Sequence, residues 1–302
     1  MNLRLAVVGV VVVVSATASA QELEPRAYAN APVGLNFLVV GYDVAVGGFV
    51  ADPALPLEDV DLRTHGPVLG FVHSLGVAGT SAKITVVVPA GVLSGSGVFD
   101  GVVRERDTSG LFDPIVRFSV NLLGAPALAS REFASYRQDW IVGASLRLTA
   151  PLGRYDPSFV ANLGTNRWSI KPEIGLSKAV KRWTFELAAS ATWFTDNDEF
   201  LVDHTREQDW IHAFQAHVIY TFRARIWVAA DWTTYGGGAT TIDGAPMTGA
   251  LSATRLGATL SLPVTMRDSL KLSWSGGVSV RTAADYEAYA LTWQHLWGAG
   301  TR

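Results

Sequence analysis

Nine charged residues and one histidine of this 302-residue chain stand at alternate positions of segments that are otherwise apolar or small. Because side chains at alternate positions of a β-strand share one face, we expect these groups on the face opposite to the apolar residues. On the inside of a closed sheet, such groups can bind or guide charged solutes. The candidates for lining an interior are Lys83, Arg117, Arg147, Lys171, Glu173, Glu186, His217, Asp231, Arg255 and Lys271.

Six of these residues are basic and three are acidic, so the surface that they share is expected to be mildly positive. One interpretation is a path that tolerates or prefers anions, such as aromatic carboxylates. The other interpretation is that the charges pair with each other and help to fill a narrow interior. The sequence leaves both interpretations open.

His217 and Asp231 could also act as the base and the orienting carboxylate of a hydrolase, with Ser190 or Thr233 as its nucleophile. No spacing motif selects these residues, so we expect no enzymatic activity. The acidic run 196–199 resembles a calcium-binding cluster but lacks the spaced loop of an EF-hand, and a solvated loop is the simpler interpretation. Since the chain has no cysteine, it forms no disulfide or thiolate metal site, and we expect neither a metal nor a cofactor.

The elements that position these groups are predicted to be strands, because apolar residues recur at every second position from about residue 34 onward. In the range 183–193, an apolar row that begins at Trp183 and ends at Trp193 alternates with Thr184, Glu186 and Ser190. An apolar row with tryptophan at both ends is typical of a strand that faces lipid between two interfacial girdles. The pattern therefore favours strands that cross a membrane.

The last strand-like segment, 289–297, carries the clearest alternation. Tyr289, Leu291, Trp293, His295 and Trp297 fall on one face, while small or polar residues occupy most of the other. Such a strand needs an apolar environment on one side only, and lipid supplies it for the closing strand of an outer-membrane barrel. A soluble amphipathic strand is the alternative that this segment alone does not exclude.

Residues 1–20 have the features of a secretory signal segment. Arg4 precedes an apolar stretch, 5–14, and Ala18-Ser19-Ala20 is a small-x-small cleavage site. Ten apolar residues are too few for a membrane-spanning helix, which needs roughly 20. We therefore expect a cleaved signal peptide at 1–20, with a retained N-terminal anchor as the alternative, and one barrel domain over 21–302.

The composition points the same way. Apolar residues make up 49% of the chain and charged residues only 17%, while the mean hydropathy is +0.23. An ordinary soluble domain has about 25% charged residues. No later stretch is long and apolar enough for a membrane-spanning helix, and the chain has no basic block that would favour nucleic-acid binding. A β-barrel reconciles these facts, because its lipid face needs apolar residues at alternate positions only.

Turn chemistry divides the alternating region into about 12 spans, separated by connections that alternate between short and long. The short connections lie near 76–80, 178–182, 223–225 and 263–268, and the long polar ones near 49–59, 94–113, 151–165, 195–209 and 236–253. Short periplasmic turns and long outer loops are typical of bacterial barrels. We therefore predict an all-β fold, a transmembrane antiparallel β-barrel of about 12 strands with both termini periplasmic. The longer connection 123–138 either holds a brief helix or marks an error in this count.

Two cross-strand neighbours can be predicted from the short turns. A turn centred on Ala224 places His217 opposite Asp231, with both side chains inward. A turn centred on residues 179–180 places Glu173 opposite Glu186, in which case a nearby cation such as Lys171 or Arg147 is needed.

A secreted β-sandwich is the soluble alternative to the barrel. It would need polar residues on its outer faces, whereas the second face of these strands holds mainly small or neutral residues. Pro172 is awkward for a central strand in either fold, because proline cannot donate a backbone hydrogen bond. The barrel is the better interpretation.

Several segments resemble the outer-membrane transporter family named after the meta-pathway of phenol degradation. They are Glu22–Phe37, Ala161–Ser177, Phe194–Phe200, Arg206–Asp209, Gln215–Phe222 and Arg255–Pro263. The resemblance covers nearly the whole mature chain and implies transport linked to the degradation of aromatic compounds. The tail 298–302, which follows the terminal aromatic Trp297, departs from the family pattern.

We therefore expect an outer-membrane protein of a Gram-negative bacterium that mediates passive passage of small, aromatic or hydrophobic compounds. The expected partners are outer-membrane lipid, lipopolysaccharide and the barrel-assembly machinery. The alternative is a structural or surface-interaction barrel with a closed lumen, whose long loops bind a partner outside the cell.

Overall fold

The structure, a computed structural model, describes residues 24–47, 58–223, 225–280 and 285–298. The expected signal segment, 1–20, lies outside the described residues. Within the described part of the chain, no helix is long and apolar enough to cross a membrane.

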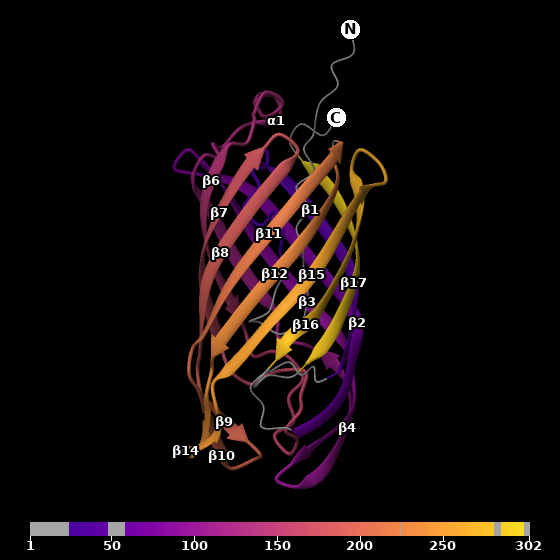
Figure 1. Cartoon of the computed structure of the whole chain (residues 1–302), viewed down its shortest axis with the longest axis vertical. Coiled ribbons are helices and arrows are strands. Elements are labelled where there is room, and N and C mark those ends of the chain that lie inside the picture. The colour runs from indigo at the N-terminus through magenta and orange to yellow at the C-terminus, as the bar shows by residue number, and fades with distance from the viewer. Residues whose placement is uncertain (1–23, 48–57, 224, 281–284, 299–302) are drawn as a thin grey trace.

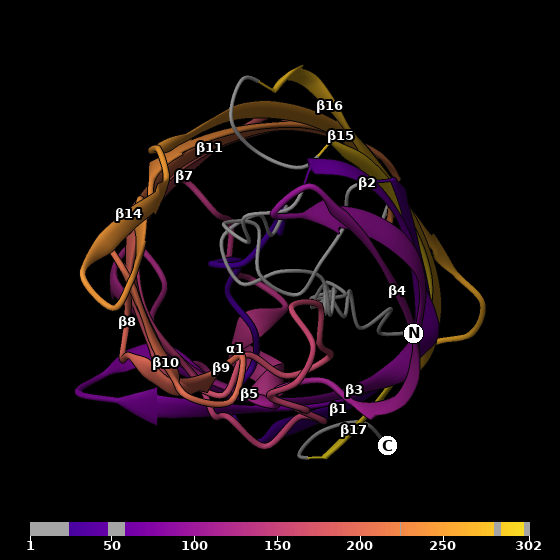
Figure 2. The same ribbon diagram turned by 90° about the horizontal axis from the view of Figure 1, so that it is seen from below.

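Twelve strands of the described chain form a closed antiparallel barrel (Figures 1 and 2). Each strand pairs with its neighbours around the wall, and the last strand pairs with the first over 13 residue pairs, from Leu35–Gly298 to Gly47–Tyr286. The prediction of a barrel of about 12 strands is therefore confirmed. The strands are β1 (Leu35–Gly47), β2 (Glu58–Val77), β3 (Thr80–Phe99), β5 (Ile115–Leu123), β6 (Trp140–Thr149), β7 (Ser169–Val180), β8 (Trp183–Phe194), β11 (Ile211–Arg223), β12 (Ile226–Gly237), β15 (Leu251–Pro263), β16 (Asp268–Val280) and β17 (Tyr286–Gly298).

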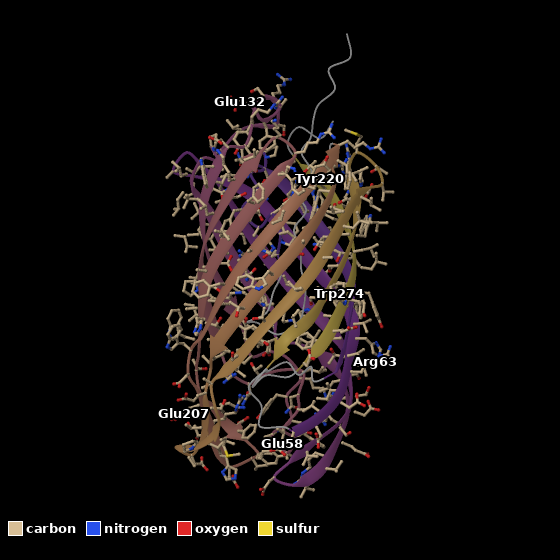
Figure 3. The ribbon with its side chains drawn as sticks, in the orientation of Figure 1. Glu58, Arg63, Glu132, Glu207, Tyr220 and Trp274 are labelled. Carbon is tan, nitrogen blue, oxygen red and sulfur yellow. The ribbon has the colours of Figure 1, made fainter. Side chains whose placement is uncertain are left out.

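The alternation predicted for these strands separates an apolar outer wall from a mixed inner wall. On β17, Leu291 and Trp297 are exposed on the outside, while Thr292 and Gln294 are buried on the inside. Aromatic side chains gather on the outer wall, where Tyr220 and Trp274 lie at different heights (Figure 3). An exposed apolar wall of this kind is stable only in lipid, so the fold is that of a membrane-spanning barrel.

The two ends of the barrel differ. At one end, here called the turn end, β1 begins, β17 finishes and the connections are short turns. The longer connection 124–139 is at this end (Figure 1). It contains the helix α1 (Ser130–Phe133), which confirms the interpretation that this connection holds a brief helix. The other end, here called the loop end, carries the long connections.

Strands continue into the loop end. The range 94–113, predicted to be a polar loop, is mostly a hairpin, because β3 runs on to Phe99 and pairs with β4 (Val102–Leu111). This prediction was wrong because Ser and Gly in 94–97 weaken strand propensity without preventing backbone pairing. A second, small sheet is formed by β9 (Asn197–Phe200), β10 (His204–Gln208), β13 (Thr240–Ile242) and β14 (Ala245–Thr248).

The register confirms one predicted cross-strand pair and contradicts the other. His217 lies opposite Asp231, as predicted. Glu173 lies opposite Ser190, and Glu186 lies opposite Ser177 and His217, so the predicted Glu173–Glu186 pair was wrong. The cause is the turn: β7 and β8 pair out to Val180–Trp183, and the tight turn that joins them uses Lys181 in a left-handed conformation, φ 56°.

Pro172 is accommodated within β7 by a local gap in one ladder. Its residue pair with Leu146 of β6 is intact, but the pairing with β8 passes from Ile170–Trp193 directly to Glu173–Ser190. The proline nitrogen, which has no hydrogen to donate, therefore faces β8.

Candidate functional site

The inner wall carries the ten residues that the sequence analysis selected. Eight of them lie near one another, and Arg255 and Lys271 lie farther along the wall. The side chains of all ten are buried within the barrel or nearly so. The strands that hold them are β3 (Lys83), β5 (Arg117), β6 (Arg147), β7 (Lys171, Glu173), β8 (Glu186), β11 (His217), β12 (Asp231), β15 (Arg255) and β16 (Lys271).

Three of the basic residues form a row across neighbouring strands. Arg117 of β5 lies directly opposite Arg147 of β6, and Arg147 lies directly opposite Lys171 of β7. Like charges directly opposite each other on one face are unfavourable, so such a row requires anions close by. We call Arg117, Arg147 and Lys171 the cation row.

Among the described residues, the carboxylates of Glu173 and Glu24 form ion pairs with the cation row. Glu173 lies 3.0 Å from Nη2 of Arg117 and 3.9 Å from Nζ of Lys171. The second carboxylate belongs to Glu24, which forms an ion pair with Nη1 of Arg117. Glu24 precedes β1, so it reaches the row from the lumen and not from the wall.

The segment 24–34 lies inside the barrel, where it is bound to strands from several sides. The Arg26 amide donates a hydrogen bond to Glu186 (2.7 Å), and its guanidinium donates one to Thr221 (2.8 Å). Nζ of Lys83 donates to the carbonyl of Ala27 (2.6 Å). Near the turn end, the Val33 amide donates to the carbonyl of Leu128 (2.9 Å). We call residues 24–34 the inner segment.

Tyr28 anchors the inner segment in a slot of the wall. Gly143 of β6 and Gly175 of β7 are cross-strand partners, and a Cβ on either glycine would lie 2.1 Å from a ring atom of Tyr28. The hydroxyl of Tyr28 donates to Glu173 (2.9 Å) and lies 3.3 Å from the hydroxyl oxygen of Ser145. The pair of glycines therefore leaves room for one aromatic ring, which we call the glycine slot.

A further polar cluster continues around the wall from Glu186. Ser177 donates to Glu186 (3.0 Å), while Nδ1 of His217 lies 2.7 Å from Oδ1 of Asp231. The other carboxylate oxygen of Asp231 accepts a hydrogen bond from Thr259 (3.1 Å). These contacts tie β7, β8, β11, β12 and β15 together on the inside.

Arg255 and Lys271 lie apart from the cation row. The guanidinium carbon of Arg255 is 3.7 Å from the centre of the Tyr286 ring, and its Nη2 donates to the Tyr286 carbonyl (2.9 Å). Lys271 is buried on β16, opposite Ser261 of β15 and Thr292 of β17. The structure thus brings eight of the ten residues together and leaves these two elsewhere on the wall.

A neighbouring part of the inner wall is apolar. A buried cluster on β1, β2, β3, β5 and β17 includes Phe37, Val39, Val68, Val72 and Leu296. The inner wall therefore has a charged side and an apolar side, which meet at β3 and β5.

The space between the inner segment and the cation row is almost filled. A cavity of about 20 Å³ remains there, bordered by Glu24, Tyr28, Arg147, Glu173 and His217 among others. This is room for about one water molecule. At this level the barrel is closed by its own inner segment.

The residues of the inner segment and the two glycines were not among the sequence-based candidates. The candidates were selected because they are charged and alternate within strands, and the inner segment belongs to no strand. Glycine at corresponding inward positions of two adjacent strands is the signal that could have revealed the slot.

The two hydroxyl groups considered as hydrolase nucleophiles, those of Ser190 and Thr233, lie on β8 and β12. The hydroxyl of Thr233 donates to the carbonyl of Phe214 (3.2 Å), and Ser190 lies opposite Glu173 and Ala213 in the ladders. Among the residues that the structure describes, no group of three or more His, Asp or Glu side chains is placed to hold a metal ion.

Comparison with known proteins relates the chain to one family and to other barrels. A family model described as "Putative MetA-pathway of phenol degradation" matches residues 43–294. An outer membrane channel from Pseudomonas putida F1 is similar, with a TM-score of 0.76 and 23% identity over 91% of this chain and 100% of that chain. The β domain of the Bordetella autotransporter BrkA has a TM-score of 0.54 and 10% identity over 88% of this chain and 100% of that chain. These two similarities show a shared fold, and no curated protein matches the chain.

Proposed function

The chain belongs to the family of the MetA pathway of phenol degradation, and on that premise we propose that it carries small aromatic or hydrophobic compounds passively across the outer membrane. The apolar outer wall suits a lipid bilayer, and the similar channel from Pseudomonas putida F1 is an outer membrane protein. In this proposal the turn end faces the periplasm and the loop end faces outward, where lipopolysaccharide surrounds the barrel.

The observation that carries the proposal is the way in which the lumen is closed. The inner segment is held by ion pairs, backbone hydrogen bonds and one aromatic ring in a slot, and it is not a strand of the wall. Displacing it breaks no strand pairing, so the lumen can open while the barrel remains intact. A barrel that stays closed and has no transport role does not need a lumen filled by a segment that can leave it.

The two sides of the lumen support a solute with both an apolar and an anionic part. Phe37 and Val72 belong to the apolar side, and the cation row lies on the charged side. A small aromatic carboxylate satisfies both sides at once, which is the reason to favour this class of solute.

A second candidate function is a closed barrel whose loop end binds a partner outside the cell. The filled lumen, with a cavity of about 20 Å³, favours it. The loop end also carries folded elements that could present a binding surface, namely the β3–β4 hairpin and the small sheet of β9, β10, β13 and β14 (Figure 1).

Flux through the purified, refolded barrel in lipid bilayers separates the two functions. We expect ion and benzoate flux with a preference for anions, and we expect Arg147→Glu and Lys171→Glu to reverse this preference. A heat-modifiable, correctly folded barrel that passes neither ions nor benzoate would contradict the transport role and favour the closed barrel. The proposed role is non-enzymatic, and ester hydrolysis by the same folded protein would contradict that part.

A further inference from the structure

The connection between β6 and β7, residues 150–168, enters the mouth of the barrel at the loop end. Its residue Leu163 is buried in one apolar cluster with Leu62 of β2 and Leu93 of β3. Both strand residues occupy the alternate positions that face the inside, so the connection packs on the inner wall. We call residues 154–164 of this connection the outer lobe.

The outer lobe is folded on itself as a unit. The side-chain oxygen of Asn162 accepts a hydrogen bond from the Asp156 amide (3.0 Å), and its side-chain nitrogen donates to the carbonyl of Phe159 (2.8 Å). At the base of the lobe, the Gly164 amide donates to the carbonyl of Arg154 (2.9 Å). A loop whose ends meet and whose side chains bind its own backbone is compact in itself. The outer lobe can therefore move without unfolding.

The neck of the outer lobe is fastened to the wall by Asp113, which lies between β4 and β5. Oδ1 of this carboxylate accepts a hydrogen bond from the Gly153 amide (2.9 Å), and Oδ2 accepts bonds from the amide (2.8 Å) and the hydroxyl (2.7 Å) of Thr165. The two chains of the neck run close together, because a Cβ on Gly153 would lie 2.8 Å from Cα of Gly164. One carboxylate thus holds both ends of the lobe at a single point, so the neck is the place for a hinge.

Arg106 of β4 holds the far end of the outer lobe. Its Nε donates to the carbonyl of Ala161 (3.1 Å), and its Nη2 donates to the side-chain oxygen of Asn162 (3.1 Å). Its guanidinium carbon lies 3.9 Å from the centre of the Phe159 ring. These contacts and the apolar cluster around Leu163 make up the seat of the lobe. None of them is a strand pairing, so the seat can open while the barrel stays folded.

The outer lobe covers a large part of the mouth. On one side it meets β2 and β3, and on the other side its Tyr155 hydroxyl accepts a hydrogen bond from Asn197 of β9 (2.9 Å). β9 follows β8 in the chain, and the strands of the wall from there onward are β8, β7, β6, β5, β3 and β2. The lobe therefore reaches along six of the 12 strands of the wall. A solute that enters from the loop end on this side must pass the lobe.

We propose that the outer lobe is a lid over the loop end of the lumen, which lifts as one piece about the neck at Gly153 and Gly164. Arg106 and the apolar cluster keep the lid shut, and Asp113 keeps it attached when it lifts. The lid is separate from the inner segment, which closes the barrel at the level of the cation row. Its role in admitting solutes rests on the proposed transport function, whereas its movement does not.

Because the chain has no cysteine, single cysteines can report the opening of the seat. Leu163→Cys and Leu93→Cys place a thiol on the lobe and on the wall, and both residues are 1% exposed when the lid is shut. We expect both thiols to react slowly with a water-soluble maleimide in the folded, detergent-solubilised chain. Adding Arg106→Ala should speed both reactions by about tenfold, because the shut lid then loses two hydrogen bonds and a cation–π contact.

Arg104→Ala is the matched control, since Arg104 is an exposed arginine of the same strand, and it should leave both rates unchanged. Rates that do not rise in Arg106→Ala, or that rise equally in Arg104→Ala, would overturn the lid. Ile219→Cys, buried in the wall on β11, reports loosening of the whole barrel. Its labelling should not respond to Arg106→Ala, and an equal response at all three thiols would also overturn the lid.

Hydrogen exchange separates a lid that lifts as one piece from a loop that unfolds. The Asp156 amide is bonded to Asn162 within the lobe. In Arg106→Ala its exchange rate should stay within about twofold of the rate in the parent chain, because lifting preserves this hydrogen bond. An acceleration as large as that of the thiol reactions would show that the lobe unfolds, which would overturn the proposal.

Flux through a locked barrel connects the lid with transport. Oxidation of a chain that combines Leu93→Cys with Leu163→Cys should join the wall and the lobe by a disulfide. Benzoate flux in lipid bilayers should then fall by about tenfold or more and recover on reduction, because the lid cannot lift. Flux that is equal in the oxidised and reduced barrels would keep transport and reject the lid. Thiol rates that rise in Arg106→Ala in a barrel that passes no benzoate would keep the moving lobe and reject transport.

Discussion

His217 of β11 and Asp231 of β12 lie directly opposite each other on the inner wall, with Nδ1 of the histidine 2.7 Å from Oδ1 of the aspartate. Thr259 of β15 donates a hydrogen bond to the other oxygen of the same carboxylate, at 3.1 Å. Both members of the pair are at most 4% exposed. One carboxylate therefore connects three consecutive strands of the barrel where water has almost no access.

The first prediction concerns this connection. Asp231→Ala should lower the free energy of unfolding by about 1–3 kcal/mol, because it leaves His217 and Thr259 buried without their acceptor. Urea-induced unfolding in lipid vesicles, followed by tryptophan fluorescence, measures the change. Asp198→Ala, at an exposed position of β9, is the control and should change stability little. Combining Asp231→Ala with His217→Ala should cost less than the sum of the two single changes.

The second prediction concerns the closure of the lumen. Gly143→Ala places a Cβ 2.1 Å from the Tyr28 ring and should expel the inner segment from its slot, so the conductance of the barrel in planar bilayers should rise. Gly41→Ala is the control, because a Cβ there lies no closer than 3.2 Å to its nearest neighbour, the hydroxyl oxygen of Thr292. A folded Gly143→Ala barrel with the conductance of the parent chain would show that the inner segment does not limit flux.

The third prediction concerns the lipid-facing wall. Val218 is 40% exposed near the middle of β11, beside the inward-facing His217. Val218→Arg should lower the free energy of unfolding in lipid vesicles by about 2–4 kcal/mol, the cost of an arginine on the lipid face near the bilayer midplane. Val264→Arg is the comparison, because Val264 lies in the turn between β15 and β16 and is also exposed. Equal effects of the two changes would contradict the placement of Val218 in the bilayer and of Val264 outside it.

The fourth prediction concerns pH at the loop end. Hydrogen bonds from His204 and from the Thr205 amide lower the pKa of Asp243 below the usual carboxyl value of 3.8. A carboxyl group whose pKa is lowered in the folded state stabilises that state above its ordinary pKa, and this contribution is lost as the pH falls through the lowered value. Hydrogen exchange of the Thr205 amide should therefore be slow at pH 6 and lose its protection below about pH 4. In Asp243→Asn the protection should no longer change over this range.

Much of the barrel follows from local sequence alone. The period of two between apolar and polar residues assigns each side chain to the lipid or to the lumen, as Leu291 and Thr292 illustrate. A short turn near Ala224 was enough to pair His217 with Asp231. The same reasoning failed for Glu173 and Glu186, because the position of the β7–β8 turn shifts the register, and the turn is set by the left-handed conformation at Lys181.

The site itself could not be predicted from the strand pattern. That pattern placed Arg117, Arg147 and Lys171 on one face, but only the register of β5, β6 and β7 makes them direct neighbours. Glu24 contacts this row, and Tyr28 occupies the glycine slot. Both belong to the inner segment, whose sequence lacks the alternation that would predict where it lies. The face that each strand residue occupies can be predicted from the sequence, because it depends on neighbouring residues along the chain. What fills the lumen is seen only in the folded chain, because it depends on contacts between residues more than 90 positions apart, such as Glu24 and Arg117.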